Sequence, residues 1–145
     1  MPHFVLPINP NGALLSVCVG VSAPRAAALR SASQPVPNPI LVQGLVDTGA
    51  SGVCIDPSIL QQLSLQATGI GSMITPSTGS VPVPTPVYDI SVKVPHAGAS
   101  LDFDSIPAME SVLANQGFAV LIGRDILSKC LLVFDGYSGF YTLAF

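Results

Sequence analysis

Prolines and glycines interrupt this 145-residue sequence at short intervals, and the segments between them are rich in β-branched and other apolar side chains. Short apolar runs bounded by turn-forming residues are typical of a mostly β domain that closes into a sandwich or barrel. The length predicts a single domain over residues 1–145 with one hydrophobic core. Strands are expected at six runs, residues 13–21, 40–46, 87–94, 118–122, 130–135 and 140–145.

Helical stretches are few and short. The stretch DPSILQQLSL has Asp56 as a candidate N-cap and Pro57 at the first helical position. GRDILSKC directly follows an expected strand, and PAMESVLANQG could form a helical turn that ends at Gly117. Residues 22–39 are small and polar with a Pro-rich end, which predicts an exposed connection whose Ala-rich centre could form a helical turn.

Three prolines recur with a period of two in the stretch SVPVPTPVYD, at Pro82, Pro84 and Pro86. In a strand these residues share one side, so their missing N–H groups leave one edge without donors, which an outer strand of a projecting hairpin tolerates. The preceding GSMITPSTGS supplies the other arm and a turn. A hairpin is therefore expected at residues 74–87, although an ordinary edge hairpin would fit the same pattern.

The chain carries few charges. Charged residues make up 9% of the sequence, hydrophobic residues 49%, and the net charge is -3. This composition gives no basic footprint for nucleic acid or for an anionic membrane. So little surface charge favours an apolar surface that is partly covered by another chain.

The three cysteines, Cys18, Cys54 and Cys130, are widely spaced and lie in apolar runs. No Cys-x-x-Cys pair or Cys/His cluster is present, so no metal and no cofactor are expected. Free cysteines in apolar runs favour a cytoplasmic location and leave a secreted or periplasmic one open. The apolar stretch at residues 12–23 lacks preceding Lys or Arg and is expected as a buried strand, not a signal peptide.

One acidic residue, Asp47, stands at the end of an apolar run in ILVQGLVDTGAS. An Asp before Thr-Gly can simply begin a turn, its carboxylate accepting a backbone N–H two residues later. A second strand-turn-helix pattern, FAVLIGRDILSKC, follows much later in the chain. Gly49 and Gly123 permit close backbone approach after each of the two strands.

These two patterns, with the hairpin between them, resemble the retropepsin family of single-domain aspartic proteases. LVDTGAS matches the catalytic loop of the family, residues 74–87 its flap, and VLIGRDIL its last strand and helix. The resemblance covers residues 40–145 in the right order, and residues 22–39 look like an insertion. It implies a closed barrel with one short C-terminal helix, a flap hairpin and a two-fold homodimer.

The resemblance also implies a reaction. Aspartic proteases use two carboxylates that share one proton around a water, and they hydrolyse peptide bonds in peptide or protein substrates. This chain has one Asp-Thr-Gly, so the second carboxylate is expected to be Asp47 of another copy. The other acids considered lack the strand-Asp-Thr-Gly setting; they are Asp102, Asp104, Asp125 and Asp135.

Further roles carry over from the family motifs. The catalytic loop consists of Asp47, Thr48 and Gly49, with Thr48 bonding across the dyad. Substrate contacts are expected from the residues after the loop, from the flap tip and from the second strand, namely Ala50, Val53, Ser77, Thr78, Gly79, Leu121 and Ile122. Structural roles are expected for Gly123, Arg124 and Asp125.

The sequence departs from the family at two places. Many retroviral enzymes carry an acid where Ser51 stands, paired with the arginine of the Ile-Gly-Arg motif; here Asp125 or another acid would have to pair with Arg124. The flap has Pro76 and a Thr/Ser-rich tip in place of several glycines. Two other functions fit the residues, an idle dimerisation or peptide-binding module of the same fold, and a transport or secreted β domain in which Asp-Thr-Gly is only a turn.

Overall fold

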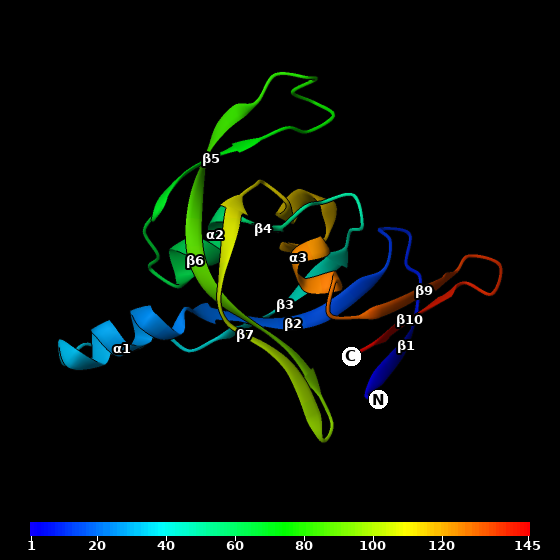
Figure 1. Cartoon of the computed structure of the whole chain (residues 1–145), viewed down its shortest axis with the longest axis horizontal. Coiled ribbons are helices and arrows are strands. Elements are labelled where there is room, and N and C mark those ends of the chain that lie inside the picture. The colour runs from blue at the N-terminus through cyan, green and yellow to red at the C-terminus, as the bar shows by residue number, and fades with distance from the viewer.

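The computed structural model describes all 145 residues, and the chain is mostly β (Figure 1). Three α-helices and one 3₁₀ turn interrupt ten strands. In chain order the elements are β1 (His3–Pro7), β2 (Leu14–Val21), α1 (Ala23–Ser31), β3 (Ile40–Val46), β4 (Val53–Ile55), α2 (Pro57–Gln62), β5 (Gly69–Met73), β6 (Val83–His96), β7 (Ala99–Glu110), η1 (Ala114–Gln116), β8 (Val120–Ile122), α3 (Arg124–Leu127), β9 (Leu131–Asp135) and β10 (Phe140–Ala144).

Six strands form a closed barrel in the order β2-β3-β8-β4-β7-β6, which an antiparallel pairing of β2 with β6 completes. Alternate residues of each strand point inward, as the two-residue period of a strand requires. In β2 these are Leu15, Val17 and Val19, and all three are buried. The barrel interior is thus the hydrophobic core, and the predicted closed barrel is confirmed.

The hairpin of β5 and β6 projects from the barrel (Figure 1). β5 adds to the outer end of β6, with Ile70 opposite Pro86 and Ser72 opposite Pro84. On its other side β6 pairs with β7 only from Val87 onward. Pro84 and Pro86 therefore lie in the part of β6 that β7 does not reach, where a missing N–H costs no ladder hydrogen bond.

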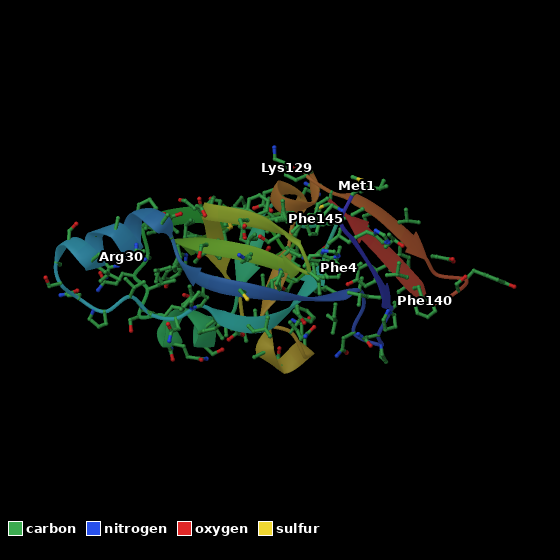
Figure 2. All side chains as sticks on the ribbon, turned by 90° about the horizontal axis from the view of Figure 1, so that it is seen from below. Met1, Phe4, Arg30, Lys129, Phe140 and Phe145 are labelled. Atoms are coloured by element: carbon green, nitrogen blue, oxygen red, sulfur yellow. The ribbon has the colours of Figure 1, made fainter.

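The strands at the two ends of the chain form a separate three-stranded sheet, in the order β1-β10-β9. The Tyr141 hydroxyl of the central strand donates to the carbonyl of Leu14 at the start of β2. Phe4 and Phe145, labelled in Figure 2, pack with ring centroids 6.1 Å apart, and His96 of the β6–β7 hairpin stands edge-on to both rings. These contacts fix the terminal sheet to one end of the barrel.

The segment at residues 22–39 starts with the nine-residue helix α1, which extends from the barrel on the side away from the terminal sheet (Figure 1). The Ser22 hydroxyl accepts the N–H of Arg25, and a proline lies in the first turn, so the helix has a clear start. The expected connection therefore holds a full helix in its Ala-rich part and an irregular chain after it.

The prediction of a helical turn at residues 107–117 is wrong for residues 107–110, which belong to a strand. β7 continues through Glu110 because it pairs with both β6 and the short strand β4, which sets Ala108 opposite Val53. Only Ala114–Gln116 forms a single 3₁₀ turn, and Gly117 ends it with a φ of 88°. The pairing partners of β7 override the helix-like composition of this stretch.

Candidate active site

Topology brings the two motifs to one edge of the barrel. β3 and β8 are parallel neighbours, with Val46 opposite Ile122, so the residues that follow them emerge side by side. The backbone N–H of Asp47 donates to the carbonyl of Ile122 at 3.0 Å. The Asp-Thr-Gly loop and the Ile-Gly-Arg-Asp turn therefore form one continuous backbone unit.

Two glycines make this unit possible. A Cβ on Gly123 would lie 2.5 Å from the carbonyl oxygen of Gly52 and 2.8 Å from its Cα, closer than any real side chain could approach. The φ of Gly123 is -85°, so it is space and not backbone conformation that excludes a side chain here. The close backbone approach expected at Gly123 is present, and its partner is Gly52.

The carboxylate of Asp47 has two different oxygens. Oδ1 accepts the N–H of Gly49 at 2.8 Å and the N–H of Ala50 at 3.2 Å. Oδ2 has no hydrogen-bond partner in the chain. Asp47 thus begins a turn with one oxygen, as an Asp before Thr-Gly commonly does, and keeps the other oxygen available for a ligand.

Arg124 holds the same loop from the other side. Its Nη1 donates to the carbonyls of Thr48 and Gly49 at 2.9 and 3.1 Å, and its backbone N–H donates to Ala50 at 3.0 Å. The chain contains a single ion pair, between Lys93 and Asp102, so no acid pairs with Arg124. The partner of Arg124 is the backbone of the Asp-Thr-Gly loop.

Asp125 has a structural task of its own, and the expectation that it could pair with Arg124 is wrong. Its Oδ2 accepts the N–H of Val53 at 3.0 Å and its Oδ1 accepts the N–H of Ile126 at 2.9 Å. Because both oxygens are engaged by backbone donors, Asp125 ties β4 to the start of α3.

A groove of about 790 Å³ runs between this unit and the β5–β6 hairpin. Among the residues named from the motifs, Asp47, Ala50, Val53 and Leu121 line it. Gly49, Arg124 and Asp125 also reach it. The opposite walls come from β5 and the segment after it, and from β6 and β7, through Ser72, Met73, Ile74, Thr75, Pro76, Val87, Pro107, Met109 and Ser111.

Other predicted site residues lie outside the groove. Ile122 and Gly123 are buried, and Thr48 is exposed with its carbonyl held by Arg124. Ser77, Thr78 and Gly79 lie in the hairpin tip, where Thr78 Oγ1 accepts the N–H of Thr75 in a compact turn. The hairpin thus lines the groove with residues 72–76, just before the predicted tip residues.

A thiol also lines the groove. Burial, together with the neighbouring carboxylates of Asp47 and Asp125, raises the pKa of Cys54 to about 11. The thiol therefore stays protonated near neutral pH and is a poor nucleophile. Of the two carboxylates in this groove, Asp47 is the one with an oxygen that no donor occupies.

The described residues offer little to a metal ion. No group of three or more His, Cys, Asp or Glu side chains lies close enough together to hold one. All three cysteines are free.

A second depression, of about 390 Å³, lies at the far end of the β6–β7 hairpin. It has no acidic lining residue, so the groove at Asp47 is the better candidate for an active site. No helix is long and apolar enough to cross a bilayer.

Comparisons with known proteins identify the fold. No protein-family model matches the sequence, and no curated protein matches it. Among solved structures, a retropepsin-like aspartic protease from Rickettsia conorii superposes with a TM-score of 0.56 at 15% identity, covering 97% of this chain and 89% of that one. The retroviral protease-like domain of Ddi1 from Leishmania major also matches, with a TM-score of 0.40 at 15% identity, over 86% of this chain and 82% of that one.

The chain therefore has the fold of the retropepsin-like aspartic proteases, as its sequence motifs predict. Its Asp-Thr-Gly loop stands at the end of β3, on the edge of the barrel that faces the groove.

Proposed function

We propose that this protein is an aspartic endopeptidase that hydrolyses peptide bonds with a water held between two Asp47 carboxylates, one from each subunit of a homodimer. The observation that carries the proposal is the position of Asp47, which lines the groove with Oδ1 fixed by two N–H groups and Oδ2 unbonded. Such a carboxylate is oriented before substrate arrives, which is what a general base requires.

The second carboxylate has to come from another chain. Within one copy the only other acid that lines the groove is Asp125, and backbone donors occupy both of its oxygens. Asp56 is buried beyond the groove. A two-fold axis through the Asp47 loops would supply a matching carboxylate and build one active site from two copies.

The exposed apolar side chains support association of two copies. Val5, Leu131, Val133, Phe134 and Phe140 lie on the terminal sheet and are each about half exposed or more. Exposed apolar clusters of this kind favour a protein partner. Because β10 is already paired on both sides, an interface at this sheet would use the apolar side chains and the free edges of β1 and β9.

The chemistry then follows from the shared proton. The ionised member of the pair takes a proton from water as it attacks the peptide carbonyl, and the protonated member donates to the carbonyl oxygen. The exposed hydroxyl of Thr48 would bond to the partner loop and keep the two carboxylates coplanar. The β5–β6 hairpin would close over an extended substrate and exclude water.

Subunit mixing tests the proposal. A fixed amount of wild type is mixed with a ninefold excess of Asp47→Asn under conditions that allow exchange, and cleavage of a random peptide library is followed by mass spectrometry. If one Asp47 from each copy is required, statistical mixing lowers activity to about a tenth. Unchanged activity would show that one chain is sufficient, while no cleavage by wild type from pH 4 to 8 would favour the idle peptide-binding module. An unrelated protein at the same excess is the control.

A further inference from the structure

The guanidinium of Arg124 has donors that nothing in the chain uses. Arg124 is exposed and lines the groove, and only its Nη1 is bonded, to the carbonyls of Thr48 and Gly49. Nε and Nη2 make no hydrogen bond, and no carboxylate oxygen lies within 4.0 Å of the guanidinium. An arginine with free donors at the wall of a groove is a ready binding site for an anionic group, whose oxygens accept its hydrogen bonds.

No local acid pairs with this site. Position 51, next to the catalytic loop, holds a neutral serine. Asp125 is directed at the N–H groups of Val53 and Ile126, and Asp47 Oδ1 at those of Gly49 and Ala50. Arg124 is also the only cationic side chain among the residues that line the groove.

The side chain is already held in place. Two hydrogen bonds from Nη1 to neighbouring carbonyls fix the plane of the guanidinium, so a ligand would not have to order a mobile arginine. The planar fork matches the geometry of a carboxylate, which accepts two parallel N–H bonds.

We propose that Arg124 is a specificity-determining residue that selects peptide substrates with a Glu or Asp side chain beside the scissile bond. This inference rests on the proposed function, because it assumes that the bound ligand of the groove is a peptide. A two-fold dimer would carry one Arg124 on each side of its axis, so acidic residues are favoured at two symmetry-related positions of the substrate.

Cleavage preference tests this inference on the active protein. The substrate is a synthetic dodecapeptide library in which Glu, Gln, Lys and Leu are equally represented at every position. Wild type is expected to favour Glu over Gln by about tenfold in kcat/KM at the selected positions at pH 6. The preference should shrink at pH 4, where a Glu side chain with a pKa near about 4.3 is largely protonated. Equal cleavage of Glu and Gln peptides at pH 6 would overturn the inference.

Substitutions separate recognition from support of the loop. Arg124→Gln is expected to remove the Glu preference, whereas Lys129→Gln removes the same charge from an exposed residue outside the groove and should keep it. If Arg124 only supports the loop, Arg124→Gln lowers the rates for Glu and Gln peptides by the same factor. That result would overturn the inference even where overall activity falls, because the readout is a ratio.

A binding measurement keeps this test separate from the test of catalysis. Immobilised Asp47→Asn is incubated with the same library, and the retained peptides are identified by mass spectrometry. Enrichment of Glu over Gln peptides, lost in Asp47→Asn/Arg124→Gln, supports the site even if wild type cleaves nothing. Cleavage by wild type without any Glu preference keeps the proposed function and rejects the role of Arg124. No enrichment and no retained peptide also reject that role.

Discussion

Asp47 and Asp56 lie nine residues apart and begin turns in the same way, yet the chain uses them differently. Each accepts a backbone N–H two residues later, from Gly49 at 2.8 Å and from Ser58 at 2.9 Å. The Oδ2 of Asp56 also accepts the N–H groups of Leu113 and Ala114, both at 2.8 Å. The Oδ2 of Asp47 accepts none.

The two aspartates also differ in their surroundings. Asp56 is 3% exposed, and although burial alone would raise the pKa of its carboxyl group, hydrogen bonds from Ser58, Leu113 and Ala114 lower it to about 2. Asp56 is therefore a permanent anion that joins the start of α2 to the chain after β7. Asp47 lies open to the groove with half of its acceptor capacity unused. The structural aspartate, Asp56, has both oxygens hydrogen-bonded, whereas the candidate catalytic one, Asp47, has an unbonded Oδ2.

The largest expected effect tests that second oxygen. Asp47→Asn keeps an oxygen that can accept from Gly49 and Ala50 but loses the general base, so activity should fall by about 10²–10⁴-fold. Stability should change by less than about 1 kcal/mol, because an amide is nearly isosteric with a carboxylate.

Library cleavage and urea unfolding measure the two effects. Asp135→Asn is the matched control, since the Oδ1 of Asp135 also accepts an N–H in an exposed turn and Asp135 does not line the groove. Wild-type activity in Asp47→Asn would refute the assigned role of Asp47.

Replacing the other aspartate should instead affect stability. Asp56→Ala leaves the N–H groups of Leu113 and Ala114 without their acceptor and removes an N-cap, which should cost about 3 kcal/mol. Urea unfolding at pH 7 measures the loss. Asp102→Ala, which removes an exposed ion pair with Lys93 at 3.6 Å, should change stability by about 0.5 kcal/mol or less. Equal losses in both variants would mean that the buried hydrogen bonds contribute little.

A smaller effect should appear in the pH dependence of stability. The pKa of Asp56 is lowered on folding from 3.8 to about 2, so the folded state binds its proton less readily than the unfolded chain. The resulting stabilisation is complete above about pH 5 and is lost as pH falls through 3.8 towards 2, a change of about 2 kcal/mol. The difference in unfolding free energy between wild type and Asp56→Ala should therefore narrow between pH 5 and 2. A constant difference would assign the effect of Asp56→Ala to lost packing instead.

Local patterns in the sequence predict much of the fold. β-branched runs bounded by turn residues locate β2, β3, β6 and β8–β10, and the spacing of three prolines predicts the unpaired edge of the hairpin. Three strands escape prediction, namely β1, the three-residue β4 and the twelve-residue β7, whose last residues have a helix-like composition. They exist because neighbouring strands supply their partners.

The candidate site likewise contains residues that the sequence predicts and residues that it does not. Asp47, Val53 and Leu121 are predicted from motifs that are continuous in sequence, and all three line the groove. Met73 and Met109 are missed because their place depends on the register of β5, β6 and β7, with Met109 opposite Val87. The acceptors of Arg124 are missed because they are backbone carbonyls, which carry no residue-type signal.

The last prediction concerns what holds the Asp47 loop against its neighbour. Asp56 is fixed by hydrogen bonds from a distant segment, whereas the Asp47 loop is fixed partly by the contact of Gly123 with Gly52. Gly123→Ala would place a methyl group 2.5 Å from the Gly52 carbonyl oxygen, and since the three nearest atoms are all backbone atoms of Gly52, the loop has to move. Overpacking of this kind should cost about 2 kcal/mol in the free energy of unfolding.

Gly69→Ala is the matched control for this prediction, because an added Cβ there meets nothing within 4 Å and the strand backbone accepts any residue. Its effect on stability should stay within about 0.5 kcal/mol. Displacement of the loop also predicts that Gly123→Ala loses activity in excess of its loss of folded protein, since misplacing a catalytic group by about 1 Å can cost about a hundredfold in rate. Urea unfolding and library cleavage on both variants distinguish these effects. If Gly123→Ala is as stable and active as Gly69→Ala, the Asp47 loop is held by its hydrogen bonds with Ile122 and Arg124, and the glycine contact is incidental.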